Sequence, residues 1–463
     1  MKSVAAGVAA SHPATAEAGL RILGEGGSAA DAAVAAVLAC CVGETIFTGL
    51  GGGGFATYFE AATGEVTCLD FFVTVPGTDG DHRAGPMIAL DVFFGGVPQV
   101  YSVGGASVAV PGVPAGCGEV HRRWGRLPWA SVVAPAIDLA RSGVKVTPAH
   151  ARTLDACAPA LARGEGAGVY TPGGRQLSGG DLLLHPGLDH ALGGLAEEGP
   201  EIFYTGSYAS PLVEAVRAAG GALGPRDLSR YRVMETPVDQ ALLAGYRIRA
   251  RHDLSRTVDT IAGLPADLSR PSRAPGVAAA LRDQGSQKIG DTTNVSVVDG
   301  EENACVITTT LGLGSGVWLP GLGVHLNSML GEGELLTENL APGRRMPSNM
   351  CPLVVIDPSG RLAVAVGSAG ASRIRTALVD TLLGVLVDGL DMESAIGRPR
   401  LHVVGDTAHV EPGYRRDELA LLADAGWRIN EWPQLDHYFG GVTAVGRAGA
   451  AGDPRRGGVG LLL

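Results

Sequence analysis

The sequence lacks several features that would place it in a common class of proteins. Its 463 residues contain no apolar run of about 18 residues, so we expect no membrane-spanning helix. The formal net charge is −11, which does not provide the basic surface that nucleic acids or anionic membranes require. The first residues are too few and too polar for a signal peptide. These absences predict a soluble, cytoplasmic protein whose partners are small molecules.

Cysteine is scarce and irregularly placed. The seven cysteines are odd in number and show no C-x-x-C spacing, so neither a disulfide framework nor a zinc site is indicated. No H-E-x-x-H cluster and no Ser-His-Asp order is found either. We therefore expect a protein that needs neither a metal nor another cofactor.

Glycine and apolar residues are abundant instead. The chain contains 70 glycines, some in clusters such as residues 51–54, and 46% of its residues are hydrophobic. Clustered glycines predict tight turns and close backbone approaches. Because no long polar linker divides the chain, we expect one large layered unit or two closely packed halves.

Hydrophobic periodicity separates helical from strand-like parts. Helical spacing predicts two packed helices over residues 13–23 and 29–39 and a mainly helical section over 128–232. Residues 55–59 and 66–72 have the pattern of a β-hairpin. Beyond residue 292 we expect strands at 295–298, 304–309, 317–319, 353–356, 363–366 and 439–445, and a helix over 376–390. Strands with helices on both sides predict a layered α/β fold of the α+β kind, with antiparallel hairpins.

Residues 251–291 are the least regular section of the chain. They contain Pro265, Pro271 and Pro275 together with several charged residues. Such a composition predicts an exposed connector.

Two adjacent threonines, Thr292 and Thr293, follow this connector. Threonine is common in strands, so the pair taken alone is first of all the start of a strand. A threonine at a new N-terminus has a second use, because its own α-amino group can take the proton of its hydroxyl group. The pKa of an unperturbed α-amino group is about 7.7 to 8.0, so a useful fraction is neutral at physiological pH. This chemistry requires cleavage between Asp291 and Thr292.

A series of motifs along nearly the whole chain resembles the γ-glutamyltransferase family of N-terminal-nucleophile hydrolases. The motifs follow the family order and spacing and cover residues 11–19, 26–33, 49–55, 110–116, 125–129 and 452–458. In this family a precursor cleaves itself before a threonine, and both pieces stay together in a four-layer αββα sandwich. The resemblance implies the same fold here, in a short and divergent member. It implies a large piece of residues 1–291, which includes the connector 251–291, and a small piece of residues 292–463.

The resemblance also implies catalytic roles for four residues. Thr292 matches the nucleophile, and Thr310 matches the threonine that hydrogen-bonds to it and activates it. Gly370 and Ala371 lie where the family has a Gly-Gly pair whose backbone N–H groups hold the oxyanion. Alanine keeps the N–H group, and one such donor contributes about 3 kcal/mol in the transition state.

The positions that bind the substrate in the family differ in this sequence. Phe72 stands where the family has an arginine for the α-carboxylate of a γ-glutamyl group. An arginine makes charge-assisted hydrogen bonds of about 1.5 to 3 kcal/mol to a carboxylate, and a phenyl ring makes none. Further replacements at these positions are Gly312 for Asn, Met329 for Gln, Glu332 for Asp, and Ser348 and Asn349 for a serine pair. Apart from the substrate side, Asn294 stands after the threonine pair where the family has His. Several contacts that change together favour a substrate other than glutathione.

Two structural consequences follow from the comparison with the family. Arg83, Arg344 or Arg345 could supply the missing positive charge, if one of them points into the site. The family also has a substantial helical segment before the nucleophile, which residues 251–291 are too few to contain. We therefore expect a missing wall or lid, a more open site, and a different presentation of the bond between Asp291 and Thr292.

The leading hypothesis is an autoprocessing N-terminal threonine hydrolase that acts on a non-glutathione small-molecule acyl substrate. A second hypothesis is hydrolysis of a C–C bond in a keto-substituted alkylproline-type intermediate of antibiotic biosynthesis, because a ketone and an amide form the same tetrahedral oxyanion. A third is conventional γ-glutamyl transfer or hydrolysis, and a fourth is a catalytically silent small-molecule binder. The presence of both Thr292 and Thr310 argues against the silent binder. The expected partners are the substrate and the chain's own two cleavage fragments, and a homo-oligomer stays open.

Overall fold

The computed structural model describes residues 3–94, 97–254, 256–282, 292–336 and 340–463. The α-helices in these ranges are α1 (Pro13–Gly24), α2 (Ala29–Gly43), α3 (Val113–Trp124), α4 (Trp129–Ser142), α5 (Pro148–Leu161), α6 (Gly166–Tyr170), α7 (Leu188–Glu198), α8 (Ala209–Ala218), α9 (Pro225–Ser229), α10 (Thr257–Ala262), α11 (Arg273–Leu281), α12 (Arg373–Leu382), α13 (Met392–Gly397) and α14 (Arg416–Asp424).

The strands form two large sheets and several small ribbons. They are β1 (Gly7–Ala10), β2 (Gly53–Glu60), β3 (Glu65–Phe71), β4 (Ile88–Phe94), β5 (Val97–Val103), β6 (Val144–Lys145), β7 (Leu182–Leu183), β8 (Met234–Thr236), β9 (Val238–Leu243), β10 (Tyr246–Arg251), β11 (Thr293–Val298), β12 (Ala304–Thr310), β13 (Trp318–Leu319), β14 (Val324–His325), β15 (Leu353–Ile356), β16 (Leu362–Ala369), β17 (Leu401–Val404), β18 (Thr407–Val410), β19 (Arg428–Glu431), β20 (Gly441–Gly446), β21 (Gly449–Gly452) and β22 (Val459–Leu462).

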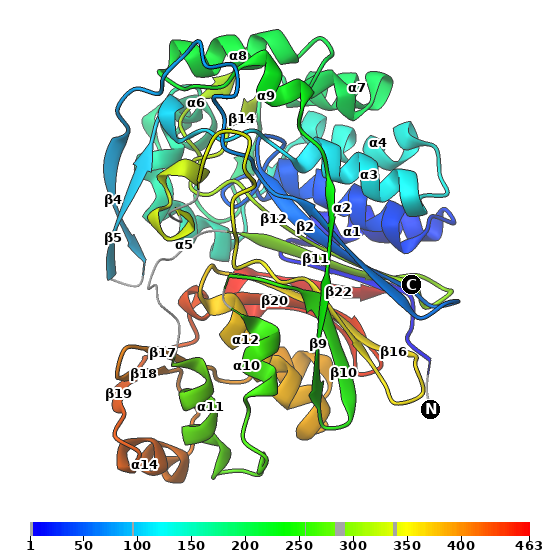
Figure 1. The fold of residues 1–463 in the computed structure, drawn as a ribbon, viewed down its shortest axis with the longest axis vertical. Coiled ribbons are helices and arrows are strands. Elements are labelled where there is room, and N and C mark those ends of the chain that lie inside the picture. The colour runs from blue at the N-terminus through cyan, green and yellow to red at the C-terminus, as the bar shows by residue number, and fades with distance from the viewer. Residues whose placement is uncertain (1–2, 95–96, 255, 283–291, 337–339) are drawn as a thin grey trace.

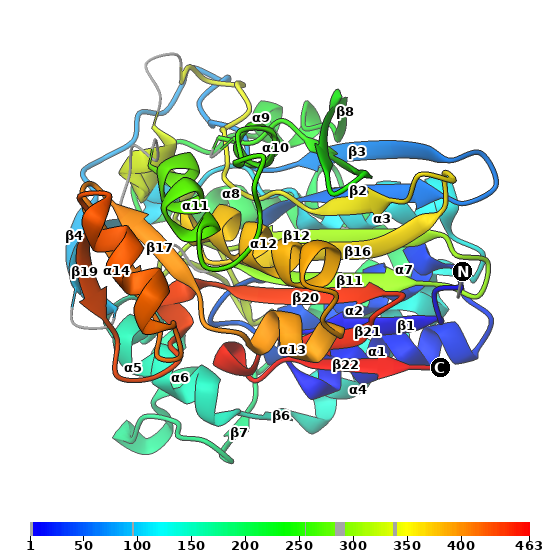
Figure 2. The same cartoon turned by 90° about the horizontal axis from the view of Figure 1, so that it is seen from below.

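The two large sheets lie face to face between two layers of helices (Figure 1). The first sheet has the order β22-β1-β11-β12-β2-β3-β8, and the second has the order β21-β20-β16-β15-β10-β9. Helices α1, α2 and α3 pack on the outer face of the first sheet, and α10, α12 and α13 pack on that of the second. Figure 2 shows the second sheet from the side of these helices. This arrangement confirms the predicted four-layer αββα fold.

Helix α2 illustrates how the composition sets the layers. All of its residues are buried, and most are alanine or valine. Small side chains let this helix lie against β11 and β12 on one side and against α1, α3 and α4 on the others. Ser28 and Asp31 form a capping box that satisfies the exposed N–H groups at its start.

A polar cluster lies among the apolar side chains between the two sheets. Asn294 of β11 accepts a hydrogen bond from Thr308 Oγ1 at 2.5 Å and donates one to Thr443 Oγ1 at 2.6 Å, while Ser296 Oγ donates to the Thr443 carbonyl at 2.9 Å. Asn294 is fully buried. The residue that replaces the family histidine therefore joins the two sheets, because its bonds run from β11 to both β12 and β20.

The prediction of an exposed connector over 251–291 was wrong for two helices but agrees with residues 263–272, which are exposed or half-buried and irregular. Residues 257–262 and 273–281 form α10 and α11, whose buried apolar side chains belong to the core of the second helical layer; α10 packs against α12, and α11 packs against α14 and β17. Arg375 of α12 donates at 2.7 Å to Thr260 Oγ1 and at 2.7 Å to the Leu281 carbonyl. Two helices this short, separated by prolines, have too few apolar repeats to be recognised by their periodicity. Residues 283–291, including Asp291, lie outside the described ranges.

The remaining expectations for the secondary structure agree with the fold. The predicted hairpin is β2 and β3, the helical section contains α4 to α9, and the predicted strands after residue 292 coincide with β11, β12, β13, β15, β16 and β20. All seven cysteines are buried, free thiols. Among the described residues, no helix combines the length and the apolarity needed to cross a membrane.

Candidate active site

The register of β11 and β12 brings Thr292 and Thr310 together. Thr293 lies opposite Thr309 in this antiparallel pair, so the register places Thr292, one residue before β11, opposite Thr310. Residues opposite each other in such a pair have Cβ atoms about 4.5 to 5.5 Å apart. Thr310 Oγ1 accepts a hydrogen bond from the N–H of Gly312 at 3.0 Å.

Strand alternation separates the two adjacent threonines. Thr293 points to the helical side of the first sheet, where its hydroxyl group donates to the carboxylate of Glu44 at the end of α2. The same carboxylate accepts from Thr15 Oγ1 at 2.8 Å. Thr292 points to the opposite side, toward the second sheet, because successive residues of a strand face opposite ways. Only Thr292 of the pair therefore reaches the cavity described next.

A small cavity between the ends of the two sheets collects most of the predicted site residues. It is lined by Phe72, Thr292, Thr310, Met329, Glu332, Leu335, Ser348, Asn349, Met350, Ala371 and Ile374. These residues come from segments that are far apart in the sequence. Its free volume is only about 20 Å³, room for about one water molecule. Every predicted catalytic and substrate-binding residue lines this cavity except Gly312 and Gly370.

Gly312 lies directly behind the cavity, next to Glu332. A methyl group added at Gly312 would come within 2.5 Å of Glu332 Oε1 and 2.7 Å of Ser328 Oγ. The φ angle of Gly312 is +65°, a conformation that favours glycine. The absence of a side chain at this position thus makes room for the glutamate, so the two replacements, Gly312 for Asn and Glu332 for Asp, belong together.

Gly370 and Ala371 form the turn between β16 and α12. The φ angles are +119° at Gly370 and +50° at Ala371, and their carbonyl groups accept from the N–H groups of Arg373 and Ile374 at 3.0 and 3.1 Å. Within the described ranges, neither N–H group of the turn has a hydrogen-bond acceptor. They lie at the N-terminal end of α12, where the helix dipole favours negative charge. This turn can therefore hold an oxyanion next to Thr292.

Phe72 is held by contacts on the side away from the cavity. Its ring stacks on Phe55 with ring centres 5.5 Å apart. The guanidinium of Arg251 lies over the Phe55 ring, 3.8 Å from the ring centre. The Phe72 carbonyl accepts from the Tyr231 hydroxyl group at 2.8 Å and from the guanidinium of Arg345. The aromatic ring therefore presents an apolar surface to the cavity.

The three arginines that could have supplied a positive charge do not line the cavity. Arg345 lies 3.4 Å from Asp70 and over the Tyr231 ring, behind the Phe72 backbone. Arg83 and Arg344 are exposed. Among the described lining residues, Glu332 is the single ionisable side chain apart from hydroxyl groups. The replacement of arginine by Phe72 is therefore not compensated by another cation in this set.

Sequence reasoning missed two buried arginines that position the site. Arg456 Nη1 donates to the Thr292 carbonyl at 3.2 Å, and its guanidinium lies over the Phe47 ring at 5.1 Å. Arg251 Nη1 donates to the Met350 carbonyl at 2.9 Å and lies 3.5 Å from that of Ser348. Arg456 belongs to the 452–458 motif, so its position carried a signal. The sequence around Arg251 carried no such signal, because the residues that Arg251 contacts lie about a hundred positions away in the sequence.

Metal ligands are not grouped in this part of the molecule. In the ranges that the structure describes, no three His, Cys, Asp or Glu side chains come together in a way that could hold a metal ion. The expectation that no cofactor is needed stays a prediction.

Comparisons with known proteins find relatives along nearly the whole chain. A sequence model described as gamma-glutamyltranspeptidase matches residues 15–261 and 265–462. The glutathione hydrolase 5 proenzyme of Rattus norvegicus is 27% identical over 98% of this chain and 92% of its own length. The acylase ACY 1 proenzyme of a Pseudomonas species is 28% identical over 95% of this chain and 89% of its own. The relatives thus include both glutathione hydrolases and acylases.

A solved structure shares the whole architecture. The cephalosporin acylase from Bacillus halodurans superimposes with a TM-score of 0.81 at 22% identity and covers 99% of this chain and 96% of its own. At this level of identity the match concerns the fold. The family model matches nearly all residues, and the fold is an αββα sandwich with a threonine-containing cavity between the ends of its sheets. The chain therefore belongs to the gamma-glutamyltranspeptidase family of N-terminal-nucleophile hydrolases.

Proposed function

We propose that this protein is an autoprocessing N-terminal threonine hydrolase that acts on a small-molecule acyl substrate other than glutathione. The observation that carries the proposal is the cavity itself, which unites Thr292, Thr310 and Ala371 with a recognition surface built around Phe72 and Glu332. The acylases among the relatives support an acyl substrate. The names of both relatives as proenzymes support processing.

The proposed reaction begins after cleavage before Thr292. The new α-amino group takes the proton of Thr292 Oγ1, and the oxygen attacks the substrate carbonyl. Thr310, whose Oγ1 accepts from the Gly312 N–H, donates its hydroxyl proton to Thr292 Oγ1. The N–H groups of Gly370 and Ala371 stabilise the tetrahedral oxyanion. The amino group then returns the proton to the leaving group, and water hydrolyses the Thr292 ester.

The lining of the cavity suggests the class of substrate. Phe72, Met329, Leu335, Met350 and Ile374 offer apolar contacts, and these suit a hydrocarbon or ring-like acyl group. Glu332 suits a hydrogen-bond donor or an ammonium group on the substrate. A free α-carboxylate would find no guanidinium in this set. We therefore propose an acyl group that carries a donor or cationic head and lacks the γ-glutamyl carboxylate.

The processing step is tested by intact mass and N-terminal sequencing of the purified protein. We expect two pieces, residues 1–291 and 292–463, that copurify. Thr292→Ala should stay a single chain and lose at least about a thousandfold in activity. Thr293→Ala is the matched control, since this threonine faces Glu44, and it should still be cleaved. A folded, active wild-type protein that remains one chain would contradict the proposal.

The substrate class is tested with a panel of anilides that differ only in the acyl group. We expect an amino-substituted alkanoyl or arylacetyl anilide to have a kcat/KM at least about tenfold above that of the γ-glutamyl anilide, because the carboxylate contact of about 1.5 to 3 kcal/mol is missing. Preference for the γ-glutamyl compound would instead support conventional γ-glutamyl transfer. Activity confined to ketones, with C–C cleavage products, would support the C–C bond hydrolase.

A further inference from the structure

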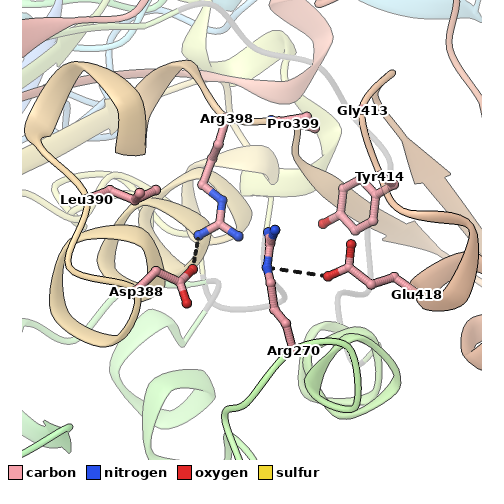
Figure 3. Close-up of a pocket in the computed structure, with 8 residues that line it drawn as sticks. All are labelled: Arg270, Asp388, Leu390, Arg398, Pro399, Gly413, Tyr414 and Glu418. Atoms are coloured by element: carbon pink, nitrogen blue, oxygen red, sulfur yellow. Dashed lines mark hydrogen bonds and ion pairs between the residues drawn. The ribbon is translucent and has the colours of Figure 1, made fainter.

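A second pocket lies between the connector and the C-terminal part of the chain. It is lined by Arg270, Asp388, Leu390, Arg398, Pro399, Gly413, Tyr414 and Glu418 and encloses about 290 Å³ (Figure 3). We call it the arginine pocket. None of these residues lines the cavity of Thr292. The volume is close to the lower limit for pockets that bind small organic ligands.

The two carboxylates of the arginine pocket already have partners. Asp388 accepts from Arg273 Nη1 at 2.8 Å and from Arg398 Nη1 at 2.9 Å. Burial alone would raise the pKa of Asp388, but Arg273 and Arg398 lower it overall. Glu418 accepts from the N–H of Arg415 at 3.2 Å as part of the cap of α14. These acceptors are therefore occupied by groups of the protein.

Among the residues described, the guanidinium groups of the arginine pocket have fewer hydrogen-bond partners than they have N–H groups. Arg270 has one ion pair, from Nε to Glu418 Oε1 at 3.4 Å, and its side chain is 37% exposed. Figure 3 shows the guanidinium groups of Arg270 and Arg398 pointing into the pocket, with the Tyr414 hydroxyl group at its edge. Burial raises the pKa of Tyr414, so its hydroxyl group keeps its proton. Within the described part of the chain, the pocket thus offers more hydrogen-bond donors than acceptors.

We infer that the arginine pocket binds a small organic anion that carries a carboxylate group. The guanidinium groups of Arg270 and Arg398 hold the carboxylate oxygens, since planar guanidinium groups match this geometry. The Tyr414 hydroxyl group donates a further hydrogen bond. Leu390 and Pro399 provide apolar contact for a carbon skeleton, which favours an organic anion over an inorganic one.

Such a ligand would connect two distant parts of the chain. Arg270 precedes α11 of the connector, whereas Arg398 and Tyr414 belong to the section after residue 292. Because a ligand that binds only the folded state stabilises it, occupation of the pocket should raise the melting temperature. It should do so without occupying the site of Thr292.

The test uses the full-length protein with succinate as the probe and its neutral diamide, succinamide, as the control for charge. We expect saturable binding of succinate in calorimetry, a matching rise in melting temperature, and no binding of succinamide. Arg270→Gln should weaken succinate binding by about tenfold or more, as the loss of a charge-assisted hydrogen bond implies. Tyr414→Phe should weaken it by a smaller factor.

A matched control is Arg428→Gln, which removes an exposed arginine that pairs with Asp406 outside the pocket. It should bind succinate like the wild type. The inference is overturned if wild-type protein shows no saturable succinate binding, or if Arg270→Gln and Tyr414→Phe both bind as the wild type does. Preferential binding of inorganic phosphate over succinate would also overturn the assignment of a carboxylate ligand.

Discussion

Strand alternation at the residue scale distinguishes Thr292 from its neighbour. The two threonines are chemically identical, yet Thr293 donates to the buried Glu44 and Thr292 reaches the cavity that also contains Thr310 and Glu332. A shift of β11 by one residue would exchange these positions. Which of the two threonines reaches the cavity therefore depends on the register of one strand, which the ladder to β12 and the cluster around Asn294 maintain.

The pair of Gly312 and Glu332 leads to a prediction at this scale. Gly312→Ala places a methyl group within 2.5 Å of Glu332 Oε1, so it should destabilise the protein by about 1 to 3 kcal/mol. In a Glu332→Asp background the shorter side chain should remove part of this cost, with a coupling of about 1 kcal/mol. Urea unfolding of the four proteins measures it. Effects that add within about 0.3 kcal/mol would contradict a direct contact.

Part of the site could be predicted from residue patterns and part could not. Matching to the family assigned Thr292, Thr310, Ala371, Phe72 and Glu332, and the structure places all five in one cavity. Their catalytic and binding roles stay predictions. The contact of Gly312 with Glu332 and the bonds of Arg456 and Arg251 to backbone carbonyl groups were not foreseen, because each joins residues whose proximity appears only in the folded chain.

At the scale of elements, the connector gives the clearest difference between sequence and structure. The long, regular segments were recognised, since α2, β11 and β12 repeat their patterns over many residues. Helices α10 and α11 were missed because each has few turns and because Pro265, Pro271 and Pro275 interrupt the pattern between and within them. Their stability comes from burial against α12 in the case of α10 and against α14 and β17 in the case of α11, which is a tertiary effect and leaves little trace in a local pattern.

Leu281 at the end of α11 tests this packing. Its side chain is 1% exposed and belongs to the core of the second helical layer. Leu281→Ala should lower the free energy of unfolding by about 2 to 5 kcal/mol. Ala279→Ser on the exposed side of the same helix is the control and should change it by less than about 0.5 kcal/mol. Equal, small effects in urea denaturation would mean that α11 does not anchor the connector.

At the scale of the whole molecule, a buried ionic cluster ties the C-terminal motif to the second sheet. Asp453 accepts from Arg400 Nη2 at 2.5 Å and from the N–H of Val442 at 3.0 Å. Arg455, which bonds to Glu411 and Asp453, lies next to Arg456, whose guanidinium contacts the Thr292 carbonyl. The integrity of this cluster therefore influences the position of Thr292.

The cluster predicts a dependence of stability on pH. Burial alone would raise the pKa of Asp453, but Arg400 and Arg455 lower it below the usual value of about 3.9. A group whose pKa is lowered by folding stabilises the protein above its unfolded pKa, and this contribution is lost as the pH falls through the lower folded value. Wild-type stability should thus decline below about pH 4.

Asp453→Asn should reduce this acid dependence. It should also cost about 3 to 5 kcal/mol at neutral pH, because two buried arginines lose a charged partner. Chemical unfolding at a series of pH values measures both effects. An unchanged slope in the variant would show that carboxylates elsewhere in the chain determine the acid response.

The order of strands in the first sheet has a consequence for the life of a processed molecule. β1, from the beginning of the chain, lies between β22 and β11, both from the section after residue 292. A cut before Thr292 would leave this strand interlaced with its neighbours, so dilution could not separate the pieces and two molecules could not exchange them. Refolding, in contrast, would require two separate chains to associate, instead of the folding of one continuous chain. The cleaved protein would therefore owe its structure to the folding of the uncleaved chain. Once unfolded, it would not readily refold.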